Sequence, residues 1–143
     1  MIPLDCLIGI LFASCRNTIT IVRSDQTKFG YKILLSSSIR ADEPTLQAIQ
    51  RTLYQQNIES KLIPKESKSY PKPILKVTKV RNLRMLTTLI VGHTNLYRKL
   101  PEEILGQWLE FERVIGYIEN KEHYTTDGFD RIVEIKESWN GGN

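Results

Sequence analysis

Cysteine and long apolar runs are scarce in this sequence. The 143 residues contain two cysteines, Cys6 and Cys15, which are too few for a disulfide framework or a cysteine-ligated zinc site. The apolar stretch that they bound is only about ten residues long, whereas a membrane-spanning helix needs about 20. We therefore expect a protein of a reducing compartment, the cytoplasm, with no membrane partner.

Signatures of common metal and cofactor chemistry are also missing. The sequence has no Gly-rich phosphate loop, no clustered metal-ligand motif and no internal repeat. His93 and His123 are far apart and have no Cys or carboxylate at metal-ligand spacing, so we assign both a structural role. Trp108 and Trp139 fit apolar helix faces and are expected in the core. We predict that the protein binds no metal or cofactor.

The composition is typical of one folded domain. The chain is 41% hydrophobic and 25% charged, which is too apolar for a disordered protein. A length of 143 residues makes one compact domain the default, because two would each be near the lower size limit. We therefore predict a single domain over residues 1–143.

Positive charge is concentrated in the middle of the chain. Residues 16–81 hold thirteen Lys and Arg against five Asp and Glu, whereas residues 82–143 hold seven against ten. This asymmetry indicates a surface that binds a polyanion. A solvated basic face is the alternative interpretation.

Hydrophobic periodicity predicts the order helix, hairpin, helix, hairpin and further helices. The expected helices are residues 3–14, 42–57, 82–92, 101–118 and 126–139, and the expected strands are residues 18–22, 31–38, 59–65 and 73–80. Such an order indicates an α+β fold, αββαββα with additional C-terminal helices, in which helices cover one face of an antiparallel sheet. The other face would be a twisted ribbon that carries the basic residues and fits a major groove.

The first helix has a sequence that runs directly into a strand. Its segment Leu7-Ile8-Gly9-Ile10-Leu11-Phe12-Ala13-Ser14-Cys15 resembles the motif of the LAGLIDADG homing endonuclease family, with Leu7, Gly9 and Ala13 as outright matches. Residues 29–33, 71–77 and 123–129 look like further family segments in the right order. The resemblance covers nearly the whole chain and implies a sheet that forms a DNA-binding saddle.

The segment departs from the motif at the positions that carry its chemistry. Phe12 and Ser14 stand at the two acidic positions, and Cys15 stands at the final glycine. In the family, the second acid binds the divalent metal that activates water for phosphodiester hydrolysis. Ser14 is uncharged and a poor ligand for Mg²⁺. Asp5 is nine residues away, or roughly 13 Å along a helix, and cannot replace it. We therefore predict no catalytic residue.

The resemblance further implies a homodimer that forms through the motif helices. Small residues allow the two backbones to approach, and the sequence contains no second motif. The predicted interface residues are Leu7, Gly9, Ile10 and Ala13. Packing of the small residues inside one monomer is the alternative.

The DNA contacts are expected on the strands and at their edges, mostly pointing outward. Lys and Arg neutralise phosphates or read guanine, and Thr contacts bases or backbone. The candidates are Arg16, Thr18, Thr20, Arg23, Lys32, Lys61, Lys65, Lys72, Lys76 and Lys79. Lys79 falls near a family position where a basic residue assists the active centre, and we assign it to phosphate binding.

The combined prediction is a homodimer that binds double-stranded DNA at a specific site without cleaving it. Transcriptional regulation in the cytoplasm, with the protein associated with the nucleoid, is one use of such a protein. Two alternatives stay open. One is a homing endonuclease that cleaves DNA with Mg²⁺ held by ligands from elsewhere, and the other is an RNA-binding intron maturase.

Overall fold

A computed structural model describes residues 2–27, 30–69, 71–93 and 102–141. In chain order the elements are α1 (Leu4–Ser14), β1 (Arg16–Arg23), β2 (Tyr31–Ile39), α2 (Glu43–Gln55), β3 (Lys61–Ile63), β4 (Ile74–Val77), α3 (Val80–Gly92), α5 (Glu102–Glu119), the short 3₁₀ helix η1 (Glu122–Tyr124) and α6 (Thr126–Gly141). This α+β order is the predicted one. No described helix is both long and apolar enough to cross a membrane.

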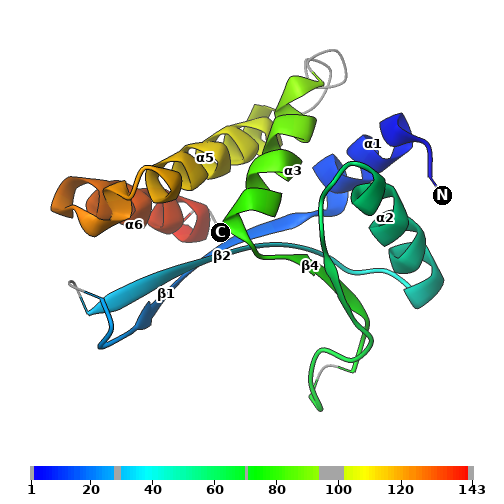
Figure 1. Cartoon of the computed structure of the whole chain (residues 1–143), viewed down its shortest axis with the longest axis horizontal. Coiled ribbons are helices and arrows are strands. Elements are labelled where there is room, and N and C mark those ends of the chain that lie inside the picture. Colours follow the sequence, from blue (N-terminus) through cyan, green and yellow to red (C-terminus); the bar gives the residue numbers. More distant parts are fainter. Residues whose placement is uncertain (1, 28–29, 70, 94–101, 142–143) are drawn as a thin grey trace.

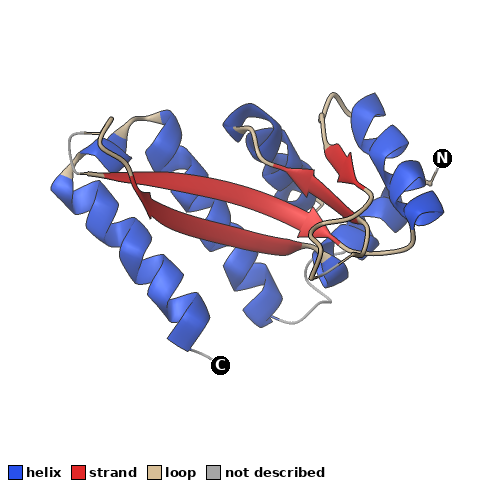
Figure 2. Cartoon of the chain, turned by 90° about the horizontal axis from the view of Figure 1, so that it is seen from below, coloured by secondary structure: helices blue, strands red, loops and turns tan. Residues whose placement is uncertain are grey.

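The four strands form one antiparallel sheet with the order β1-β2-β4-β3. The β1–β2 hairpin is its longest part, and the pairing runs from Arg16 opposite Ser38 to Arg23 opposite Tyr31. All the helices of the described ranges lie on one side of the sheet (Figure 1). The view from below shows the strands uncovered on the other side (Figure 2).

The strands of the second hairpin are shorter than the sequence pattern predicts. β3 ends at Ile63 and β4 begins at Ile74, directly beside Pro64 and Pro73. Proline cannot donate a ladder hydrogen bond, so each of these residues ends regular pairing. The described residues of the connection between them, 64–69 and 71–73, project beyond the sheet (Figure 1).

The core lies between the sheet and the helices. Ile19 and Leu35 face each other across the first hairpin and are 4% and 6% exposed. Leu11 of α1, Phe111 of α5 and Trp108 of α5 complete the same cluster. The prediction that Trp108 belongs to the core is confirmed. Burial of this apolar surface is the main term that holds the helices on the sheet.

Local signals explain where α2 begins. Asp42 is its N-cap, and its carboxylate accepts hydrogen bonds from the backbone N–H of Thr45 at 3.4 Å and from the Thr45 hydroxyl at 2.7 Å. Pro44 follows in the first turn, where its missing N–H costs nothing. Leu46 and Ile49 then face the core.

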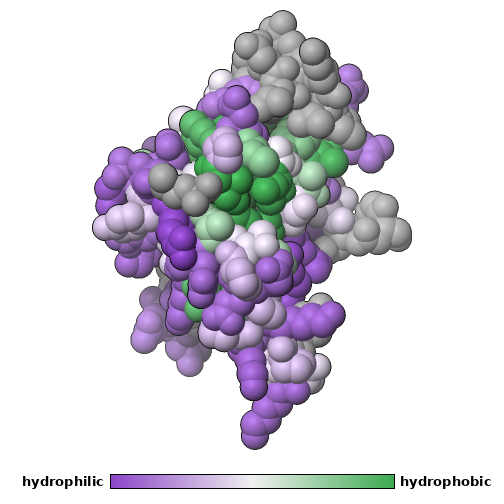
Figure 3. All heavy atoms as spheres, turned by 90° about the vertical axis from the view of Figure 1, so that its right-hand side faces the viewer, coloured by the Kyte–Doolittle hydropathy of each residue, from purple (hydrophilic) through white to green (hydrophobic). Residues whose placement is uncertain are grey.

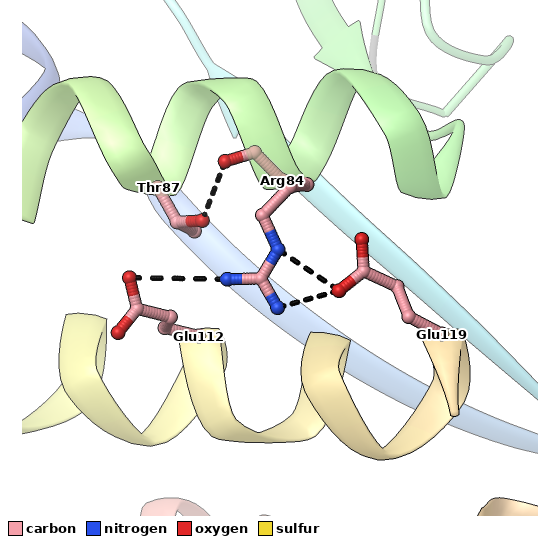
Figure 4. A network of polar contacts seen from close by, with 4 residues as sticks. All are labelled: Arg84, Thr87, Glu112 and Glu119. Carbon is pink, nitrogen blue, oxygen red and sulfur yellow. Dashed lines mark hydrogen bonds and ion pairs between the residues drawn. The ribbon is translucent and has the colours of Figure 1, made fainter. Parts of the chain in front are cut away.

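An ion cluster joins α3 to α5 (Figure 4). The Arg84 Nε and Nη2 donate to one oxygen of Glu119 at 2.9 and 2.6 Å. The Glu112 carboxylate lies 3.9 Å from the Arg84 Nη1. These contacts raise the pKa of Arg84, chiefly through the hydrogen bond with Glu119. The cluster ties a helix packed on the sheet to the C-terminal helices.

Candidate nucleic-acid interface

The uncovered face of the sheet is defined by strand alternation. Ile19 and Leu35 point to the helices, so their neighbours Thr20 and Leu34 point away and are exposed. Lys76 lies opposite Ser38, which has the same parity as Leu34, and therefore belongs to the same uncovered face. This surface, the open sheet face, is the candidate interface.

The strands that form the open sheet face contain no Asp or Glu. Their five charged residues are all basic: Arg16, Arg23, Lys32, Lys61 and Lys76. The helical layer has the opposite balance, because α5 alone carries five glutamates and one arginine. The molecule therefore has a positive sheet side and an acidic helix on the other side, and it attracts a polyanion to the sheet.

The second hairpin places two lysines side by side on this face. Lys61 and Lys76 are directly opposite each other in the β3–β4 pair. Like charges in this arrangement repel. The nearby Glu66 carboxylate is bound by Arg40, which lowers the pKa of Glu66 through a hydrogen bond, and the charge of Lys76 lowers it further. The positive charge of Arg40 neutralises the Glu66 carboxylate, so Lys61 and Lys76 keep their net positive charge.

Six of the ten residues predicted to contact DNA have the parity of the open sheet face. The residues with open-face parity are Arg16, Thr18, Thr20, Lys32, Lys61 and Lys76. Lys65 and Lys72 are exposed in the connection between β3 and β4. Lys79 is the N-cap of α3, and its ammonium lies 3.9 Å from the Glu59 carboxylate.

Arg23 differs from the expected outward orientation. It has the parity of Ile19 and Ile21, so it belongs to the helix side of the hairpin, where it is exposed at the end of β1. Sequence reasoning also missed Val22 and Leu34, which are exposed on the open sheet face. The available signal was that Val22 and Leu34 share strand parity with Thr20 and Lys32, which point outward.

The first helix separates its predicted interface residues between two faces. Leu7 is 0% exposed and packs in the core of its own chain, so in this structure it offers no surface to a second copy. Gly9 and Ala13 are exposed, and Ile10 is half-buried. A Cβ built on Gly9 meets nothing within 4 Å, so this glycine does not serve close packing inside the monomer.

The exposed stripe of α1 also contains Cys6, one turn before Gly9 and Ile10. These residues follow i, i+3, i+4 spacing and share one side of the helix. The side of the molecule on which α1 lies shows a patch of apolar atoms among polar ones (Figure 3). By residue type and exposure, the stripe Cys6, Gly9, Ile10 and Ala13 is a small, apolar surface.

The end of α1 carries the residues that replace the motif acids. Phe12 is 4% exposed and fills the core, whereas Ser14 is exposed at the last position of the helix. Burial raises the pKa of the Cys15 thiol to about 12, and a hydrogen bond with Ser37 only partly opposes this effect. The thiol therefore stays protonated, as expected of a small packed residue rather than a nucleophile.

The residues at this point do not fit a hard divalent cation. A cation such as Mg²⁺ needs carboxylates, and Ser14 offers one neutral hydroxyl. Within the described ranges, no group of three or more His, Cys, Asp or Glu side chains is placed to hold a metal ion.

The layered arrangement, the strand order and the motif helix define a class of fold. It is the fold of the LAGLIDADG homing endonucleases, as the sequence resemblance predicts. No protein-family model matches the sequence, and no curated protein matches it either.

Three solved structures illustrate the similarity. The homing endonuclease I-TnaI superposes with a TM-score of 0.81 at 20% identity, over 99% of this chain and 90% of that chain. The archaeal intron-encoded homing endonuclease I-Vdi141I, complexed with DNA, gives a TM-score of 0.81 at 18% identity, over 98% and 83%. The LAGLIDADG meganuclease I-CpaMI, bound to uncleaved DNA, gives 0.74 at 21% identity, over 96% and 45%.

Proposed function

We propose that the protein is a homodimer that binds duplex DNA on its open sheet face and does not cleave it. The observation that carries this proposal is a basic sheet face, with no carboxylate in its strands, beside a helix end that offers Ser14 instead of an acid. Two structures of the same fold, I-Vdi141I and I-CpaMI, are complexes with DNA, which supports the choice of ligand.

The charges of the open sheet face favour nucleic acid over an apolar partner. Lys61 and Lys76 repel each other in the free protein, and a phosphate between them removes that repulsion. Arg16 and Lys32 extend the positive surface along the first hairpin. Neutralised phosphates release counterions, which makes such binding strongly dependent on salt.

The comparison of lengths supports a dimer. This chain covers 90% of I-TnaI but only 45% of I-CpaMI, so the second protein is about twice as long. A second copy of this chain would supply the missing surface. The stripe of Cys6, Gly9, Ile10 and Ala13 on α1 is the surface that allows two backbones to meet. A two-fold dimer would read a pseudo-palindromic site.

DNA binding is tested first by affinity over a salt series. We expect tight binding of a randomised duplex library at low salt and a steep loss of affinity as salt rises. Competition with structured RNA distinguishes the two nucleic acids. Binding that is weak at low salt, or stronger binding to the RNA, contradicts the proposal.

Absence of cleavage is tested with the same library. The protein is incubated with Mg²⁺ or Mn²⁺, and we expect the duplexes to stay intact because Ser14 cannot hold the ion. Reproducible cleavage at one sequence, lost on substitution of a carboxylate such as Asp5→Asn, would instead establish an endonuclease. Regulation of transcription would follow from occupancy of the site without a cut.

The dimer is tested with a matched pair of glycine substitutions. Gly9 and Gly106 are both helical, and a Cβ on either one meets nothing within 4 Å. Sedimentation equilibrium should show that Gly9→Leu weakens dimerisation, because a long side chain separates the helices, whereas Gly106→Leu has no effect. A wild-type protein that stays monomeric at high concentration rules out the homodimer.

A further inference from the structure

Two aliphatic side chains stand out on the open sheet face. Val22 and Leu34 are 37% and 44% exposed, although their neighbours on this face are polar or basic. Ile21 and Ile33, the adjacent apolar residues of the same strands, have the opposite parity and face the helices. Val22 and Leu34 therefore do not contribute to the core, and their exposure requires another explanation.

The strand register brings these two side chains together. Leu34 is opposite Thr20, and Val22 is opposite Lys32, so Val22 and Leu34 are diagonal neighbours on one face. Diagonal neighbours in an antiparallel pair lie roughly 7–8 Å apart, within reach of each other. The result is an apolar strip with a hydroxyl group on one corner and an ammonium group on the other.

The chemistry around the strip favours DNA bases as its partner. A protein surface that buried Val22 and Leu34 would also have to desolvate Lys32 beside them, which is costly without an anion. In duplex DNA the phosphates lie beside the base edges, so Lys32 can reach a phosphate while the aliphatic groups face the groove. Thymine is the one standard base whose major-groove edge carries a methyl group.

We propose that Val22 and Leu34 select thymine by contact with its C5-methyl group, an inference that rests on the proposed DNA binding. Successive base pairs are about 3.4 Å apart, so two side chains at the diagonal spacing reach thymines about two steps apart. Val22 is β-branched and has few rotamers, which keeps its methyl groups in place before the DNA arrives. The pair adds sequence preference to a surface whose charges alone bind any duplex.

The test begins with selection of bound sequences from a randomised duplex library. We expect two enriched thymines within about two steps of each other in each half-site. Each is then replaced by deoxyuridine, which removes only the methyl group. Loss of one buried methyl should weaken binding about fourfold. In Leu34→Ala the ratio of affinities for thymine and deoxyuridine should fall to about one at one of the two positions.

Leu109→Ala is the matched control, because Leu109 is 39% exposed on α5, a helix on the other side of the sheet. It should leave both ratios unchanged, and thermal unfolding confirms that each variant folds. Two results would overturn the thymine contact but leave the proposed DNA binding standing. In the first, the wild type binds DNA but does not distinguish thymine from deoxyuridine. In the second, the double variant Val22→Ala, Leu34→Ala distinguishes them as well as the wild type does. If the wild type binds no DNA at any salt concentration, the proposed function fails with it.

Discussion

At position 128, only glycine fits, because the backbone of Glu122 lies too close for a side chain. Gly128 lies in the first turns of α6, and a Cβ built on it would be 1.9 Å from the carbonyl oxygen of Glu122. The Thr125 hydroxyl donates to the same carbonyl at 2.7 Å and accepts from the Gly128 N–H at 3.1 Å. The turn before α6 therefore closes only around glycine.

We predict that Gly128→Ala lowers the free energy of unfolding by about 1–3 kcal/mol, because the backbone must shift to admit the methyl group. Gly106→Ala is the control: its Cβ meets nothing, and alanine should stabilise α5 by up to about 1 kcal/mol. Urea denaturation measures both. A Gly128→Ala protein as stable as the wild type would contradict the close approach.

His123 adds a dependence of stability on pH at the same turn. Desolvation lowers its pKa below the ordinary value of 6.5, and a hydrogen bond with the Tyr117 backbone only partly opposes this. The unfolded chain therefore binds the proton more readily than the folded protein. Stability contributed by neutral His123 is present above pH 6.5 and decreases as the pH falls through and below that value.

We expect the melting temperature of the wild type to fall between pH 7.5 and pH 5.5, and the fall to be smaller in His123→Gln. Thermal unfolding followed by circular dichroism over this range checks the difference. Equal pH slopes in the two proteins would show that protonation of His123 does not disfavour the fold.

At the scale of elements, packing between α3 and α5 is reinforced by the Arg84 cluster. The side chains of Arg84, Glu112 and Glu119 are 32%, 32% and 37% exposed, so solvent screens them only in part. Two donors of one guanidinium converge on Glu119, which fixes the angle between the two helices better than a single contact would.

We predict that Arg84→Ala lowers the free energy of unfolding by about 1 kcal/mol. Glu59→Gln is the matched control, since it breaks an ion pair with Lys79 whose side chains are 65% and 79% exposed, and it should change stability little. Chemical denaturation at low and high salt measures both, and the effect of Arg84→Ala should shrink at high salt. Equal effects of the two substitutions would contradict a specific role for the α3–α5 cluster.

At the scale of the whole molecule, charge separates the two sides of the sheet. Lys61 lies on the open sheet face, whereas Arg131 is exposed on α6 among the helices. If the open sheet face binds DNA, Lys61→Gln should reduce the slope of log affinity against log salt by about one, as for one lost phosphate contact. Arg131→Gln should leave the slope unchanged. Equal slopes for both variants would place the DNA elsewhere.

Local patterns were sufficient for the order of the elements. Strand alternation through Ile19 and Ile21, the N-cap at Asp42 and the apolar spacing of α2 depend on residues close in sequence, so they could be predicted without a structure. The same patterns placed most basic residues on the outer face. They overextended β3 past Ile63, because the effect of Pro64 on pairing was not taken into account, and they extended β4 to Val80, which is the first residue of α3.

The sequence by itself determined the elements, the replacement of the motif acid by Ser14 and the excess of positive charge in the middle of the chain. Only the tertiary structure decided which side of α1 is exposed to solvent: it buried Leu7 in the core and left Gly9 at the surface. It also set Lys61 opposite Lys76 and Val22 diagonal to Leu34. These neighbours depend on strand pairing and on helix burial, and both are determined by contacts between residues distant in the sequence.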